Sequence, residues 1–335
     1  MANRSKSIFL LGAGFTKAVY PVAPLNNELL KAIIDNGGNT LSKYYGSYKV
    51  DDIEKLLTQL DLESISNSEV RKDRLIINSE ISYFFSQYRF TNYVGEVPTW
   101  LYTFANTVLK EDDSIICLNY DCFLEGALDY FKIWSPNGGY ARVSNPLVDS
   151  NPNPKNIIIY KIHGSENFVE SKVDFGKRSQ TSIGFSANGF IYPISCEHSH
   201  FGGGAHDPSP YIIAPSFVKI PHVDISAMML DILDIVKTAT NLIIIGCGMR
   251  PEDNFLWLLL TRFLNNIMED KKKIIILDPS SEFIWKRIFK YWVGDICSFA
   301  DVIILPCCLE SGISSLELIL DPRSDNIGIV DRTGR

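Results

Sequence analysis

Five short apolar segments, rich in β-branched residues, recur along the chain and predict buried strands. They are continuously apolar rather than alternating, which is the pattern of parallel strands covered on both faces. Amphipathic segments with helical periodicity lie among them, at 23–38, 68–90 and 253–268. This alternation predicts an α/β fold, a Rossmann-like doubly wound parallel sheet. The five segments are SIFLLGAG (7–14), SIICLNYD (114–121), NIIIYKIHGS (156–165), NLIIIGCG (241–248) and KKIIILDPS (272–280).

Two stretches do not fit a minimal unit of alternating strands and helices. Residues from about 36 to 110 predict a mostly helical insertion, and residues from about 166 to 210, rich in Gly, Ser, Asn and aromatic residues, predict a loop-rich one. A chain of 335 residues that is 46% hydrophobic is long enough for a large core with such additions. We therefore expect one domain over 1–310 that carries both insertions, followed by a C-terminal tail at 311–335.

Charge and cysteine usage narrow the class of protein. A net charge of −7 shows no basic footprint, so direct nucleic-acid binding is not expected. The seven cysteines lie mostly in apolar runs and form no C-x-x-C pair, which is typical of reduced thiols in a cytoplasmic protein without a zinc ribbon. No apolar run approaches the roughly 18 residues that span a bilayer. The basic residues at the start, followed by IFLLGAGF, resemble a signal peptide. The apolar part is short and continues without a cleavage site, so no targeting signal is predicted.

Each of the five apolar segments ends in glycines or polar residues. Ligands of open parallel sheets bind beyond the carboxyl ends of the strands, so the topology would bring these endings to one edge. Five endings of this kind are difficult to explain by packing alone, and they predict a ligand site. The endings are Gly12-Ala13-Gly14, Asn119-Tyr120-Asp121, His163-Gly164-Ser165, Gly246-Cys247-Gly248 and Asp278-Pro279-Ser280.

The glycines of the first ending suit a nucleotide site or an ordinary tight turn. Glycine lets backbone amides approach a diphosphate at a strand-to-helix turn. The dehydrogenase fingerprint G-x-G-x-x-G is not completed, because position 17 is Lys, and this disfavours a hydride-transfer domain. The absence of G-x-x-x-x-G-K-[ST] from the sequence excludes a P-loop ATPase.

The second and third endings carry candidate catalytic groups. Asn119 and Asp121 are separated by one residue, so their side chains would point to the same side of a strand and could face one ligand. Asp121 could equally cap the helix that follows. A histidine in an apolar run is usually a core residue, but His163 stands at a strand end, where a general base active near neutral pH would stand.

Five motifs of the chain resemble those of sirtuins in their order and approximate spacing. They are GAGFT, NYD, KIHGS, IIGCG and LDPS. They are more similar to the sirtuin-like NAD-hydrolase domains of bacterial antiphage defence proteins, in which the glycine-rich turn precedes a P…APL…EL stretch, as YPVAPLNNEL does here. The resemblance covers roughly residues 5–310. It implies that NAD, as substrate, binds on a Rossmann-like sheet and that the nicotinamide–ribose bond is cleaved.

The resemblance also implies a role for each strand-end residue. Asn119 matches the catalytic Asn that orients the ribose or the attacking water, and His163 matches the catalytic His. Asp121 matches the residue that recognises the nicotinamide amide. The residues implied to contact the rest of NAD are Gly12, Ala13 and Gly14 at the pyrophosphate with Thr16 nearby, Gly246 and Gly248 along the adenosine half, and Asp278 at the adenosine ribose.

Two departures from the deacylating sirtuins disfavour protein deacylation. Their four-cysteine zinc module is missing from the sequence, and PVAPL replaces their Ile-Pro-Asp-Phe-Arg run. Cys196, His198, His200 and His206 offer a further set of metal-ligand types, but their spacing is not a standard one and no metal is expected.

The activity that the resemblance implies is an NAD+ glycohydrolase that depletes NAD+ in antiphage defence by abortive infection. Its control would come from homo-oligomerisation or from a partner, such as a defence ATPase or a nucleic-acid-guided protein. Two alternatives stay open. One is a catalytically silent subunit that binds NAD or ADP-ribose, and the other is a zinc-free protein deacylase or ADP-ribosyltransferase.

Overall fold

The computed structural model describes most of the chain. The described residues are 6–144, 153–175, 178–185, 205–213, 216, 221–265, 272–291, 296 and 299–321, with the backbone alone at 171–175, 178–182 and 205–209. Within these ranges, no helix combines the length and the apolar character needed to cross a membrane.

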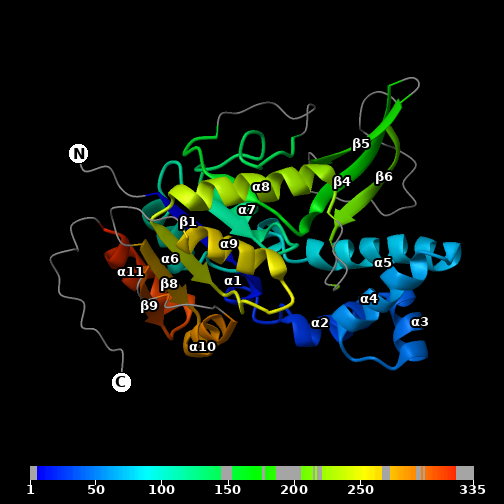
Figure 1. Ribbon diagram of the computed structural model, residues 1–335, viewed down its shortest axis with the longest axis horizontal. Helices are drawn as coiled ribbons and strands as arrows, with labels where there is room; N and C mark the ends of the chain where they lie inside the picture. Colours follow the sequence, from blue (N-terminus) through cyan, green and yellow to red (C-terminus); the bar gives the residue numbers. More distant parts are fainter. Residues whose placement is uncertain are drawn as a thin grey trace.

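A six-stranded sheet with strand order β3-β2-β1-β7-β8-β9 forms the centre of the fold (Figure 1), and all its pairings are parallel. This confirms the predicted doubly wound α/β architecture. The sixth strand, β9, was not among the predicted ones, because it is a half-buried edge strand whose second residue is Asp301. The strands are β1 (Ser7–Leu11), β2 (Ser114–Cys117), β3 (Ile158–Tyr160), β7 (Asn241–Ile245), β8 (Lys272–Leu277) and β9 (Ala300–Leu305).

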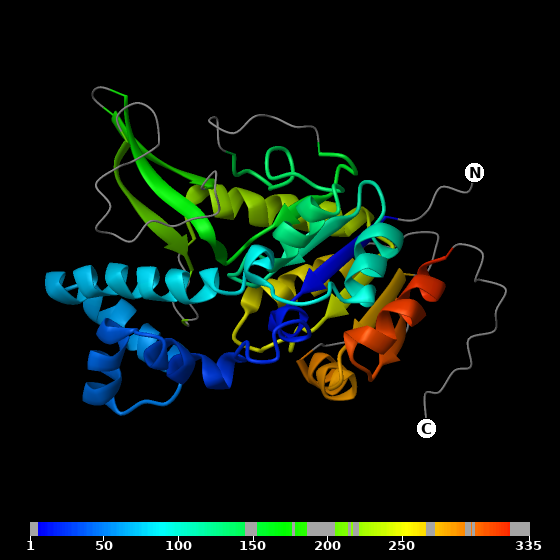
Figure 2. The ribbon, with the colours of Figure 1, turned by 180° about the vertical axis from the view of Figure 1, so that it is seen from behind.

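Helices cover both faces of the sheet, which explains why its strands are continuously apolar. On the face toward the viewer in Figure 1, α8 (Val223–Thr238) packs against α9 (Asn254–Leu264). On the opposite face, seen in Figure 2, α11 (Leu309–Leu320) packs against α6 (Thr99–Thr103) and the π-helical turn η2 (Phe104–Val108). The expected domain boundary at residue 310 therefore falls inside α11. Two more helices, α7 (Phe123–Tyr130) and α10 (Ser281–Tyr291), follow β2 and β8.

Four helices between β1 and β2 form a subdomain with its own hydrophobic cluster. Asp52 and Asn67 cap α4 and α5 by accepting hydrogen bonds from backbone amides of the first turn, the usual role of Asp and Asn at that position. The helices of the subdomain are α2 (Asn26–Asp35), α3 (Asn39–Tyr48), α4 (Ile53–Ser64) and α5 (Ser68–Ser86). The short α1 (Ala13–Lys17) precedes them, and the 3-10 turn η1 (Phe90–Asn92) follows them.

The segment expected to be loop-rich contains a three-stranded antiparallel sheet in its described part. The strand order is β5-β4-β6, with β4 (Gly164–Phe175), β5 (Arg178–Phe185) and β6 (Ala205–Ile212). Phe168 and Phe185 are fully buried, and both rings pack against the ring of Tyr140. All three rings belong to the main hydrophobic core, so these contacts anchor the small sheet to it.

Candidate functional site

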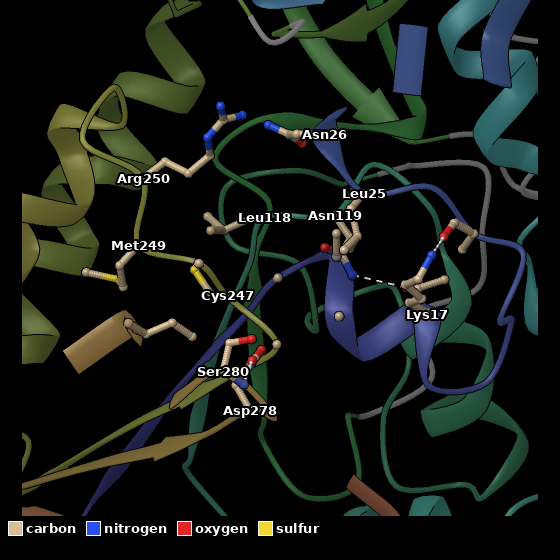
Figure 3. Close-up of a pocket in the computed structure, with 18 of the residues that line it drawn as sticks. Lys17, Leu25, Asn26, Leu118, Asn119, Cys247, Met249, Arg250, Asp278 and Ser280 are labelled. Carbon is tan, nitrogen blue, oxygen red and sulfur yellow. Dashed lines mark hydrogen bonds between the residues drawn. The ribbon is translucent and has the colours of Figure 1, made fainter. Parts of the chain in front are cut away.

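A cavity of about 930 Å³ lies at the carboxyl ends of the central strands, a volume typical of small-molecule pockets. Figure 3 shows Leu118 and Asn119 after β2, Cys247 and Met249 after β7, and Asp278 after β8 gathered around it. The topology brings together all ten residues that the motif resemblance assigns to the NAD site. The lining includes Gly12, Ala13, Gly14, Thr16, Asn119, Asp121, His163, Gly246, Gly248 and Asp278.

Three glycines let the first and fourth strand ends approach each other backbone to backbone. The amide of Gly14 donates to the carbonyl oxygen of Gly246 at 2.9 Å, and Gly246 has a φ of +58°. A Cβ atom on Gly12 would lie 2.6 Å from the Gly246 oxygen, and one on Gly14 would lie 2.7 Å from the Gly246 Cα. This close approach requires glycine at all three positions, whether or not a ligand also contacts them.

The Asn119 and Asp121 side chains share one hydrogen-bond partner, Thr16. Asn119 Nδ2 donates to Thr16 Oγ1 at 3.0 Å, and Thr16 Oγ1 donates to Asp121 at 3.0 and 3.1 Å from the two carboxylate oxygens. All three side chains are buried. Asp121 Oδ1 also accepts from the amide of Phe123, the first residue of α7, and the same side chain lines the cavity. The N-cap position of α7 itself is occupied by Cys122. Thr16 therefore fixes the orientation of both strand-end residues.

A buried ion pair holds the backbone of the turn that carries Asn119 and Asp121. The Lys161 ammonium lies 2.9 Å from Glu125 Oε1 and donates to the carbonyl oxygen of Asp121 at 2.6 Å. Burial, only partly offset by the Lys161 charge, raises the pKa of Asp121 to about 6. The sequence did not reveal this pair, because Lys161 and Glu125 lie in apolar runs that predict only a strand and a helix.

His163 is paired with a second carboxylate. Its Nε2 lies 3.1 Å from Asp253 Oδ2, both side chains are nearly buried, and both residues line the cavity. The imidazole also lies beside the Tyr120 ring, at 6.2 Å between centroids. Asp253 is the first residue of the segment 253–268, which the sequence predicted to be helical. Asp253 does occupy the N-cap position of α9, but its carboxylate makes no capping hydrogen bond.

The opposite rim is polar and lies at the ends of β7 and β8. Asp278 Oδ1 accepts from the amide of Ser280 at 2.7 Å, and burial raises the pKa of Asp278. The carbonyl oxygen of Gly248 accepts from Arg287 Nη1. Cys247, between the two glycines, is buried, and burial raises the pKa of its thiol to about 12, so it stays protonated at neutral pH.

The helical subdomain contributes a charged part of the wall that the sequence analysis missed. Glu54 of α4 accepts from Arg250 Nη1 at 2.9 Å and from Asn26 Nδ2 at 3.0 Å, and all three residues line the cavity. This ion pair joins the subdomain to the loop between β7 and α9, which also carries Asp253. No local pattern in the sequence indicates such a pairing between residues 54 and 250.

The possible metal set at residues 196–206 cannot be placed, since the side chains of Cys196, His198, His200 and His206 lie outside the described part of the structure. In the part that is described, no three His, Cys, Asp or Glu side chains are grouped to hold a metal ion.

No family model and no curated protein matches this sequence. Among solved structures, the chain is similar to a Sir2 homologue in complex with NAD, at 14% identity over 94% of this chain and 90% of that one, with a TM-score of 0.45. A variant of a Sir2 homologue in complex with ADP-ribose gives 14% identity over 94% and 92%, with a TM-score of 0.46. Sir2Tm bound to a propionylated peptide gives 10% identity over 94% and 92%, with a TM-score of 0.41. Likeness at this level assigns no activity to the chain.

The fold and the cavity by themselves define the class. This is an α/β protein with a doubly wound parallel sheet and a ligand-sized cavity at the carboxyl ends of its strands.

Proposed function

We propose that this chain is a sirtuin-like NAD+ glycohydrolase that converts NAD+ and water to nicotinamide, ADP-ribose and a proton. The observation that carries the proposal is the convergence of all ten motif residues on one cavity. Two of them are groups that such a reaction needs: a carboxamide held in place by Thr16, and an imidazole paired with a carboxylate. A doubly wound sheet with a glycine-rich first turn is also a suitable frame for a dinucleotide.

The chemistry of the bond supports this assignment. Nicotinamide in NAD+ is a cationic leaving group that departs as a neutral molecule, so no strong acid is needed. Departure leaves positive charge on the ribose, and water attacks the anomeric carbon. Because Asn119 Nδ2 donates to Thr16, its carboxamide oxygen is the atom left to accept from the water or a ribose hydroxyl. His163 then takes the proton released as the new C–O bond forms, a step that general bases typically accelerate by about 10²–10⁴-fold.

The proposed biological role is NAD+ depletion in the cytoplasm during phage infection, and it rests on the motif resemblance to antiphage proteins. Such an activity must be silent until triggered. We propose that assembly with further copies of the chain, or with a defence partner, supplies the control. Light scattering of the chain alone and with the products of neighbouring genes tests this, and a fully active isolated monomer would contradict it.

The test of the activity is to incubate the purified chain with NAD+ and quantify nicotinamide and ADP-ribose by chromatography. We expect Asn119→Ala and His163→Ala each to lower nicotinamide release by at least about 10²-fold with the circular dichroism spectrum unchanged. Asn106→Ala, which removes a half-buried side chain that donates to the Tyr102 carbonyl oxygen one helical turn earlier, is the matched control and should retain full activity. A folded Asn119→Ala or His163→Ala protein with wild-type turnover would remove that residue from the mechanism.

A further inference from the structure

We propose that Asp253 is a positioning residue for His163, which it holds in the Nε2–H tautomer so that Nδ1 is the basic nitrogen. The proposal rests on the proposed function, because it assigns a role to a second residue of the same site. Two side chains separated by 90 positions in the sequence would then act as one unit.

The distance and burial of the pair carry the argument. His163 Nε2 and Asp253 Oδ2 are 3.1 Å apart, and the two residues are 9% and 8% exposed. An ionised carboxylate has no hydrogen to donate, so at 3.1 Å from Asp253 Oδ2 a protonated Nε2 is favoured over an Nε2 that presents its lone pair. A neutral imidazole has one donor nitrogen and one acceptor nitrogen, and the lone pair therefore lies on Nδ1. Of the two nitrogens, only Nδ1 is then able to take a proton from water.

The place of Asp253 in the fold supports a role beyond local structure. Asp at the N-cap usually accepts from the amides of the first helical turn, and this contact typically contributes about 1 kcal/mol. Asp253 occupies the N-cap of the 11-residue α9 yet makes no such bond. Its carboxylate is directed instead to the histidine on the cavity wall. A residue selected for helix capping alone would make the capping bond.

The loop that carries Asp253 is held on both sides. The Asp253 amide donates to the Arg250 carbonyl oxygen at 3.2 Å, and the amide of Leu256 donates to the Asp253 carbonyl oxygen at 3.0 Å. The Arg250 guanidinium is in turn paired with Glu54 of the helical subdomain at 2.9 Å. The carboxylate is thus fixed by its own backbone and by α4, which is what orienting an imidazole requires.

The tautomer can be observed directly by NMR of imidazole-15N-labelled protein at about pH 8.5, where histidine is normally neutral. Subtraction of the His163→Ala spectrum identifies the His163 signals. We expect the Nε2–H form in the wild type. In Asp253→Asn the amide group can donate to Nε2, and the Nδ1–H form should appear. A wild-type Nδ1–H tautomer, or a spectrum unchanged by Asp253→Asn, would overturn the proposal.

Kinetics provide the second readout. Asp253→Asn should lower kcat for nicotinamide release by at least about 10²-fold while KM for NAD+ changes less than about threefold, because the contact with the general base is lost and ground-state binding is not. Asp231→Asn, which removes a partly exposed ion pair between Asp231 of α8 and Arg142, is the matched control and should be unchanged. Equal kcat values for Asp253→Asn and wild type would refute the proposal.

The two proposals fail in different ways. A wild-type protein that releases no nicotinamide contradicts the proposed function, yet its spectrum still decides the tautomer. An active wild type with the Nδ1–H form contradicts only the role of Asp253. If Asp253→Asn fails to fold, the wild-type spectrum remains decisive.

Discussion

Replacement of Gly246 by alanine tests whether backbone packing alone requires glycine at the end of β7. Two effects lower the stability of the alanine variant at this position. The left-handed conformation, with φ at +58°, costs a non-glycine residue about 1–2 kcal/mol. The new Cβ would also lie 2.6 Å from the amide nitrogen of Phe15, which is backbone and cannot rotate away, and such overpacking typically costs about 1–3 kcal/mol. We therefore expect the free energy of unfolding to fall by about 2–5 kcal/mol.

Two further glycines separate these costs. Gly37 has a φ of +98° with no atom within 4 Å of its Cβ position, so Gly37→Ala isolates the conformational cost at about 1–2 kcal/mol. Gly248 has an ordinary φ, and its Cβ would lie 3.6 Å from Arg287 Nη1, so Gly248→Ala should stay within about 0.5 kcal/mol of wild type. Urea denaturation followed by tryptophan fluorescence gives all three values without ligand. If Gly246→Ala is no less stable than Gly37→Ala, the packing argument is refuted.

Two further predictions, each with a control variant, test how burial changes the energy of a charged side chain. Burial raises the pKa of Asp121 to about 6 in the folded state, whereas aspartate in an unfolded chain titrates near pH 4. The free energy of unfolding of the wild type, relative to that of Asp121→Asn, should therefore fall as the pH rises from about 4 to about 6 and then stay level. Parallel urea-derived stability curves for the two proteins across that window would contradict this. Arg89→Met leaves the Glu166 carboxylate buried without its cation and should cost about 3–5 kcal/mol in urea denaturation. Lys43→Met breaks an exposed pair with Asp73 and should cost less than about 1 kcal/mol; equal losses in the two variants would show that burial does not set the energy.

The central sheet was predictable from local pattern. Residues 7–11, 241–245 and 272–277 are strands in the structure, and each had been predicted from a continuous run of apolar residues. A strand with helices on both faces has no polar side, so the signal is contained within the segment itself. β9 lacked this signal, because at the sheet edge its side chains are only partly buried and Asp301 is tolerated there.

The helical subdomain was predictable in kind and less so in extent. The segments 23–38 and 68–90 form α2 and α5 with shorter ends, at Asn26–Asp35 and Ser68–Ser86. Three of these four ends lie three or four residues inside the predicted ones, because helix ends depend on capping contacts and on what packs against the last turn, which the periodic pattern does not contain. The small antiparallel sheet was not predicted, because Gly- and Ser-rich segments do not show the alternation of apolar and polar residues that predicts strands.

The grouping of the motif residues at one cavity could be anticipated from sequence, because parallel strands present all their carboxyl ends at one edge. The pairs that tune those residues could not. Asp253 with His163, Glu54 with Arg250, and Glu125 with Lys161 are each joined only by folding. The sequence around a charged residue does not indicate which residue of opposite charge it will contact in the folded protein.

The sequence by itself therefore determined the doubly wound sheet and the edge at which its polar strand ends gather, because burial on two faces and the parallel topology are encoded segment by segment. Only the tertiary structure decided that Thr16 joins Asn119 to Asp121, and that a residue placed to cap α9 instead pairs with His163. The physical reason is that hydrogen bonds and ion pairs depend on distances of about 3 Å, which are set by the packing of segments far apart in the chain.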